Sequence, residues 1–240
     1  MIGAFLNAFG ILAGALFGLA RHQPLSARTQ NFFKAGLGGL AVLAGLHLVW
    51  LSINGTFLSA GKQLLLAGLS VVLGNWLGKL LGLQKFSNRA GRYAASLLTA
   101  AQKNPPGKSA GGLVAVTILF CAAPLGIIGA VTDGLSNYFY LLALKAVMDG
   151  LAMMSFVKIF RWPVALAAIP VLAFLNGCAL ATHSYAAPFL DAHHWTDSVN
   201  AAAGLVVCAT ALVILGIRRV ELANYLPALV LAPLLTRLFH

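Results

Sequence analysis

The stretch GAVTDGLSNYFYLLALKAVMDGLA, residues 129–152, contains the pattern AVxDGL twice, first at Ala130–Leu135 and again at Ala146–Leu151. The two copies place Asp133 and Asp149 in apolar sequence, in a chain that has only five acidic residues. An ionised aspartate near the middle of a bilayer costs about 2.5–3.5 kcal/mol, so it persists mainly where it faces a protein interior or a wet cavity. The repeat therefore indicates where a functional site would lie.

The composition around this stretch is typical of a membrane protein. Sixty per cent of the residues are hydrophobic and nine per cent are charged, whereas charged residues alone make up about a quarter of a soluble domain. Uncharged apolar runs long enough to cross a hydrocarbon core of about 30 Å recur along the chain. We therefore predict an all-α, polytopic transmembrane helical bundle that forms a single integral membrane domain over residues 1–240.

Eight membrane spans are expected from the apolar runs. The first is interpreted as a span rather than a cleaved signal peptide, because MIGAFLNAFG has no basic region. The predicted spans are Ile2–Ala20, Ala35–Ser52, Leu64–Leu83, Gly111–Thr132, Tyr138–Val157, Trp162–Thr182, Val199–Ile217 and Leu222–Phe239.

The loops between these spans predict the orientation, because Lys and Arg accumulate on the cytoplasmic side of a membrane. The four odd-numbered loops carry the bases, and the even-numbered loops are poor in them. The bases of the odd loops are Arg21, Arg28, Lys34, Lys85, Arg89, Arg92, Lys103, Lys108, Lys158, Arg161, Arg218 and Arg219. We expect a multi-pass protein of the cell inner membrane with both termini outside. These loops also account for the net charge of +11, so no nucleic-acid partner is expected.

The long third loop, about residues 85–110, has a helical pattern of its own. Apolar residues recur at intervals of three and four between Phe86 and Ala101, and Asn104-Pro105-Pro106-Gly107 ends the pattern. We predict a short amphipathic helix on the inner leaflet with its bases toward anionic lipid. A solvated linker is the alternative.

Two segments early in the chain resemble two segments late in the chain. AFLNAFGILAG at Ala4–Gly14 is similar to AFLNGCALATH at Ala173–His183, and GLAVLAGL at Gly39–Leu46 is similar to GLVVCATA at Gly204–Ala211. The match relates span one to span six and span two to span seven. A shift by five spans inverts the direction, so we predict an inverted three-helix repeat, residues 1–84 and 162–240, around a central helix pair at 111–160.

The candidate binding residues are Asp149, Asp133, Lys145, Asn7 and Asn176. Lys145 lies one helical turn from Asp149, so the two could simply form an intrahelical ion pair. Because a charged pair loses its hydration in lipid, we expect this face to turn toward a polar cavity instead.

The other three candidates have structural alternatives too. Thr132-Asp133-Gly134 is also compatible with an ordinary turn between spans four and five. Asn7 and Asn176 occupy equivalent positions in the predicted repeat. Each either forms a hydrogen bond between helices or contacts a solute.

Catalytic, metal and cofactor sites are not indicated. Cys121, Cys178 and Cys208 lie in apolar spans without metal-ligand spacing, and no nucleophile elbow or Walker A motif occurs. We favour a secondary transporter or channel for a small solute or cation. A membrane-embedded enzyme or a non-transporting, lipid-organising assembly protein remains as an alternative, and glycine pairs such as Gly74 and Gly78 leave a homo-oligomer open.

Several motifs together resemble a known family. MIGAFLNAFGILAGALFGL, GAVTDGL, KAVMDGLA and RRVELANYLPALVLAPLL are similar to the YqgA/YdfK-type family of bacterial inner-membrane proteins over nearly the whole chain. The resemblance implies a multi-pass membrane protein and no particular activity, because the family is itself a domain of unknown function. Members often carry Gly-Glu where this chain has Gly74-Asn75.

Overall fold

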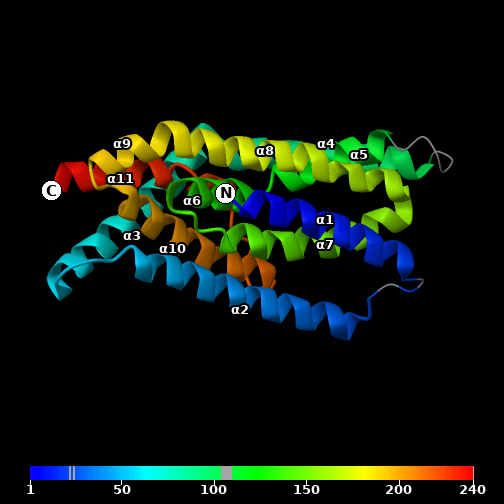
Figure 1. The fold of residues 1–240 in the computed structure, drawn as a ribbon, viewed down its shortest axis with the longest axis horizontal. Helices are drawn as coiled ribbons and strands as arrows, with labels where there is room; N and C mark the ends of the chain where they lie inside the picture. Colours follow the sequence, from blue (N-terminus) through cyan, green and yellow to red (C-terminus); the bar gives the residue numbers. More distant parts are fainter. Residues whose placement is uncertain (22, 24, 104–109, 240) are drawn as a thin grey trace.

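The described part of the chain is helical almost throughout (Figure 1). The computed structural model describes residues 1–240 except 22, 24, 104–109 and 240, and these residues contain no strand. The helices are α1 (Gly3–Ala20), α2 (Ala27–Leu51), α3 (Phe57–Leu81), α4 (Leu83–Lys103), α5 (Ala110–Cys121), α6 (Pro124–Ser136), α7 (Tyr140–Phe160), η1 (Trp162–Ala167), α8 (Ala168–Ala181), η2 (Thr182–Ala186), α9 (Ala187–Ala192), α10 (Thr196–Ile214), η3 (Leu222–Tyr225) and α11 (Ala228–Phe239).

The expectation of about eight spans is met, with changes to two of them. Seven of the described helical segments are long and apolar enough to cross a membrane, and an eighth span results if α5 and α6 count as one. These two helices meet at a break with a bend of 58°. The predicted span Gly111–Thr132 is therefore broken into two half-helices, and the second half continues to Ser136. The sixth span is also longer than predicted, because it continues through η2 and α9 to Ala192.

Pro124 explains the break between α5 and α6. A proline has no N–H to donate and its ring clashes with the carbonyl four residues earlier, so it fits the first turn of a helix and kinks or breaks a helix in its interior. The residue before it, Ala123, is extended with φ −68° and ψ 119°, as the preceding position usually is. Most residues of α6 are buried, so this half-helix lies inside the bundle.

Small residues let several helix pairs approach closely. A side-chain carbon added to Gly14 of α1 would lie only 2.6 Å from Gly150 Cα of α7. The same holds between α2 and α10, where a carbon on Gly45 would lie 2.6 Å from the Gly204 carbonyl oxygen. Gly74 and Gly78 of α3 likewise pack closely against Ala228 and Asn224 of the same chain. The predicted glycine pair therefore packs inside one chain.

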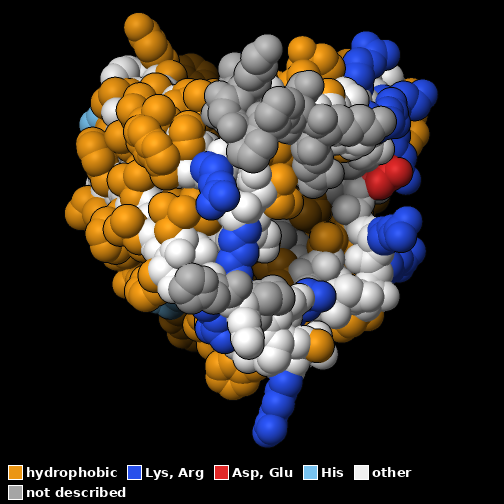
Figure 2. All heavy atoms as spheres, turned by 90° about the vertical axis from the view of Figure 1, so that its right-hand side faces the viewer, with side chains coloured by type: hydrophobic (Ala, Val, Ile, Leu, Met, Phe, Trp, Pro, Cys, Tyr) orange, Lys and Arg blue, Asp and Glu red, His pale blue; other side chains and the backbone are white. Residues whose placement is uncertain are grey.

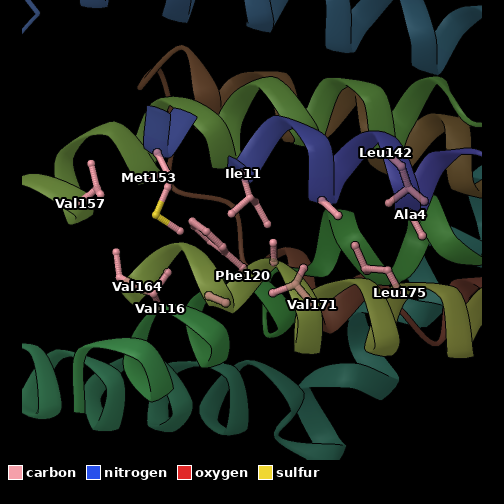
Figure 3. Close-up of a cluster of buried hydrophobic side chains, with 14 of the residues drawn as sticks. Ala4, Ile11, Val116, Phe120, Leu142, Met153, Val157, Val164, Val171 and Leu175 are labelled. Carbon is pink, nitrogen blue, oxygen red and sulfur yellow. The ribbon is translucent and has the colours of Figure 1, made fainter. Parts of the chain in front are cut away.

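The largest apolar core is formed by α1, α5, α7, η1 and α8 (Figure 3). Ile11, Phe120 and Met153 point toward one another there, and each is at most 4% exposed. A second cluster joins α2, α6, α7 and α10. The helix α7 contributes to both clusters, which places it at the centre of the bundle.

The predicted amphipathic helix forms as α4, but it is not a free surface helix. The Gln84 backbone N–H donates to Asn224 Oδ1 at 3.0 Å, and the Ala223 N–H donates to Gln84 Oε1 at 3.2 Å. Ala94 is fully buried, whereas Phe86 and Tyr93 of the predicted apolar face are exposed. One side of α4 therefore packs on the bundle, where Leu98 contacts the main core, and Phe86 and Tyr93 face outward.

The basic residues gather at the end of the bundle where α1 ends and α2 begins. Figure 2 shows Lys and Arg side chains around a hollow on this face, with acidic side-chain atoms also in view. This distribution agrees with the basic loops expected on one side. Which side faces the cytoplasm stays a prediction.

The inverted repeat also stays a prediction. Contacts of Gly38 with Leu215 and of Gly45 with Gly204 make α2 and α10 antiparallel. Contacts of Gly74 with Ala228 and of Gly78 with Asn224 make α3 and α11 antiparallel. These are the opposite directions that an inverted repeat requires, although they do not by themselves demonstrate superposition.

Candidate functional site: a buried charge cluster at the helix break

Lys145 and Asp149 form an ion pair inside the protein. They lie one turn apart on α7, and Lys145 Nζ donates to Asp149 Oδ2. Lys145 is 2% exposed and Asp149 is 7% exposed. The two residues therefore form the intrahelical ion pair that their spacing made possible. Lys145 and Asn7 contact the carboxylate, and the polar cavity expected next to Asp149 stays a prediction.

The helix break provides the space for Lys145. Gly126, in the first turn of α6, has no side chain, and a carbon added there would lie 2.8 Å from Lys145 Cε. On the other side of the break, the ring of Phe120 in α5 has its centroid 5.6 Å from Lys145 Nζ, within reach of a cation–π attraction. The ammonium group therefore lies where α5 ends and α6 begins.

Asn7 of α1 completes the cluster. Its Nδ2 donates to Asp149 Oδ2 at 3.0 Å, and the residue is fully buried. Asn7 Oδ1 has no hydrogen-bond partner among the described residues. A buried acceptor without a partner costs on the order of 1–3 kcal/mol, which makes this oxygen a site where a donor would be stabilised.

Asp133 lies in a second, separate polar contact. It is inside α6 and 1% exposed, so the alternative of a turn at Thr132-Asp133-Gly134 is wrong. Its Oδ2 accepts from the Gly3 N–H of α1 at 3.1 Å, and its Oδ1 lies 3.8 Å from the Met1 amino nitrogen. A carboxylate is favoured at a helix N-terminus, so Asp133 acts as a cap supplied by another helix.

In both copies of the repeated AVxDGL sequence, the aspartate forms a hydrogen bond to α1. Asp133 bonds to Gly3 and Asp149 bonds to Asn7, so both acids hold α1 at points one turn apart. The glycine after each aspartate allows a neighbouring helix to approach. Carbons added to Gly134 and Gly150 would lie 2.9 Å from Thr182 Cβ and 2.7 Å from the Gly10 carbonyl oxygen, respectively.

Asn176 is not part of this network. It is half-buried on α8, and its side chain makes no hydrogen bond to the described residues. Asn7 and Asn176 therefore lie in different environments, although the repeat predicts equivalent positions. Sequence reasoning also missed Phe120 and Gly126. The proline at position 124 could have predicted the helix break that places these two residues beside Lys145.

Three pockets open at the surface of the described residues. One, of about 200 Å³, lies near the ends of α2 and α11 and is lined by polar residues that include Lys62, His194 and Asp197. Two others, of about 380 and 520 Å³, lie between α2 and α7. Lys145 and Asp149 line none of these three. Among the described residues, no three His, Cys, Asp or Glu side chains come together as a metal site would need.

The charged groups of the cluster are buried and bonded to one another in this conformation. The ammonium and the carboxylate neutralise each other, and Asn7 and Phe120 provide the remaining polar contacts. A cation or a proton that reached Asp149 would compete with Lys145 for the carboxylate. Access would require α1, α5 or α6 to move relative to α7.

Comparisons with known proteins identify the family of the chain. A family model described as "Protein of unknown function (DUF554)" matches residues 2–237. The chain is 30% identical over 233 residues to "Uncharacterized protein YqgA" of Escherichia coli K12, covering 97% of this chain and 94% of that protein. It is 25% identical over 245 residues to "Uncharacterized membrane protein YdfK" of Bacillus subtilis 168, covering 100% of this chain and 97% of that protein. No solved structure matches. The chain is a membrane protein whose described residues include seven or eight apolar segments long enough to span a bilayer, and it belongs to the DUF554 family.

Proposed function

We propose that this protein is a secondary transporter or channel for a small solute or cation, and that Asp149 is the residue that binds the moving charge. The observation that carries the proposal is the buried Lys145–Asp149–Asn7 cluster at the break between α5 and α6. Ionisable residues within a membrane are costly and usually mark a transport pathway. Broken helices near the middle of the bilayer commonly form the binding sites of transporters.

The conformation described here corresponds to a closed state. Lys145 occupies the position of a bound cation beside Asp149, and Asn7 Oδ1 is the acceptor still available. In an open state, water and the solute would reach the break, and Lys145 would separate from Asp149. A built-in ammonium that competes with the transported cation would keep the empty site neutral.

Flux measurements in proteoliposomes test this proposal. The probes are gradients of protons, Na⁺ and K⁺, each imposed singly, with charge movement recorded on a solid-supported membrane. Wild-type protein is expected to give a current with at least one of them. Asp149→Asn, which keeps the shape and removes the charge, is expected to abolish that current at equal folded yield.

Two controls separate function from folding. Asp191→Asn changes an exposed acid outside the cluster and is expected to leave the current unchanged. The double variant Lys145→Met/Asp149→Leu removes both charges without leaving either unpaired, and it is expected to fold and remain inactive. Full current in Asp149→Asn, or no current in the wild type with any of the three ions, would contradict the proposal.

A further inference from the structure

The two pockets between α2 and α7 form one groove. Both are lined by Leu37, and both take their remaining lining largely from α2 and α7. We call this the α2–α7 groove. On its far side α2 packs closely on α10, where Gly45 meets Gly204. The face toward α7 is looser, so Leu40 and Leu43 remain 56% and 64% exposed.

The groove is polar and basic at one end. The pocket there, of about 380 Å³, is lined by Lys34, Lys158, Gln23, Gln30 and Ser155 above a floor of apolar residues. Both lysines are exposed, and neither has an acidic partner among the described residues. This end belongs to the basic face of the bundle (Figure 2).

The groove is apolar over the rest of its length. The second pocket, of about 520 Å³, is lined by leucine, alanine and valine side chains and ends at His47, Tyr138 and Tyr140. From Lys34 to His47 the helix α2 rises about 20 Å. One leaflet of a bilayer has a hydrocarbon thickness of about 15 Å, so the groove is long enough for an acyl chain.

We propose that the α2–α7 groove binds an anionic phospholipid. Its phosphate lies between Lys34 and Lys158, and one acyl chain runs along Leu40, Leu43 and Val147 toward Tyr138. The charge pattern selects this occupant, because two ammonium groups without a carboxylate favour an anionic headgroup over a zwitterionic one. Basic pockets between transmembrane helices on the cytoplasmic side bind anionic headgroups in the same way. This site is independent of the buried cluster and of the proposed transport.

A competition in nanodiscs tests the headgroup contact. Full-length protein is reconstituted with equal amounts of phosphatidylglycerol and phosphatidylcholine, released into the gas phase, and analysed for retained lipid by native mass spectrometry. Wild type is expected to retain phosphatidylglycerol. In Lys34→Gln/Lys158→Gln, the ratio of retained phosphatidylglycerol to phosphatidylcholine is expected to fall roughly thirtyfold. Each base near a membrane surface raises the affinity for an anionic lipid on the order of fivefold.

The matched control changes two bases outside the groove. Arg89→Gln/Arg92→Gln removes the same charge from exposed positions on α4 and is expected to keep the preference. If both double variants lose it equally, the attraction is a general property of the basic face and the groove is not a specific site. Equal retention of both lipids by the wild type would also overturn the proposal.

A photo-crosslinker locates the acyl chain without altering the lysines. Benzoylphenylalanine at Leu40 lies in the groove, and the same group at Leu65 of α3 lies on an apolar surface that is 75% exposed. We expect lipid adducts at both positions, with phosphatidylglycerol enriched only at Leu40. An identical lipid ratio at the two positions would overturn the proposal, as would a cross-link from Leu40 mainly to a second copy of the chain.

Discussion

The stability of the Lys145–Asp149 pair can be measured with a double-mutant cycle. Lys145→Met leaves a buried carboxylate, and Asp149→Leu leaves a buried ammonium group. Since both side chains are almost fully buried, each single change is expected to cost about 3–5 kcal/mol in the free energy of unfolding. If the two changes were independent, their effects would sum to about 6–10 kcal/mol.

The double variant is expected to cost far less than that sum. Replacing both charges by apolar groups of similar volume removes the desolvation penalty along with the attraction. The remaining loss is the hydrogen bond to Asn7 Nδ2, which leaves one buried donor unpaired at about 1–3 kcal/mol. The cycle should therefore show a coupling of at least about 3 kcal/mol.

The assay is reversible unfolding in mixed micelles of a mild detergent and increasing sodium dodecyl sulfate, followed by tryptophan fluorescence. Lys79→Met, an exposed lysine on α3, is the matched control and should change the free energy of unfolding by less than about 0.5 kcal/mol. Additive effects of Lys145→Met and Asp149→Leu would refute the reasoning, because they would show that the two side chains do not interact in the folded protein.

Three further predictions follow from the packing and the loops. Gly150→Ala should destabilise the protein because its added carbon would clash with the Gly10 carbonyl. Gly68→Ala, with open space around it, should stabilise it by about 0.5–1 kcal/mol; the opposite order in the same micelle titration would contradict the close α1–α7 contact. Asp133→Ala should cost about 0.5–2 kcal/mol through loss of the cap on α1, and an unchanged unfolding curve would count against that cap. Reporter fusions after Lys103 and at His240 should lie on opposite sides of the membrane; reporters on the same side would exclude the eight-span topology.

The sequence predicted those parts of the fold that depend on local pattern. The bounds of α1 and α7 follow from their apolar length, and the Lys145–Asp149 contact follows from a spacing of one turn. The basic loops likewise predicted one basic end of the bundle. Hydrophobic length and charge are properties of neighbouring residues, so no knowledge of tertiary structure was needed for them.

The contacts that define the cluster are long-range and could not be predicted in this way. Asn7 meets Asp149 across 142 positions of the chain, and Gly126 makes space for Lys145 only because α6 is a separate half-helix. Hydropathy treated α5 and α6 as one span, since Pro124 lies in sequence that is apolar on both sides. The position of Asp133 was ambiguous for another reason: Asp and Gly favour both turns and helix ends.

The closed cluster must become accessible to water if it serves transport, and Cys121 can report this. It is the last residue of α5, next to Phe120, and it is half-buried. The chain has three cysteines, so the background Cys178→Ala/Cys208→Ala leaves Cys121 as the single thiol. A membrane-impermeant methanethiosulfonate reagent is applied to proteoliposomes from each side.

The account predicts that Cys121 reacts from one side at a measurable rate and that a gradient of the transported ion changes this rate. Lys145→Met/Asp149→Leu should remove the dependence on the gradient while the protein remains folded. If Cys121 stays unreactive from both sides under all three ion gradients, while a cysteine placed at the exposed position Ser155 reacts fully, the break is a permanently dry structural element and the central claim is contradicted.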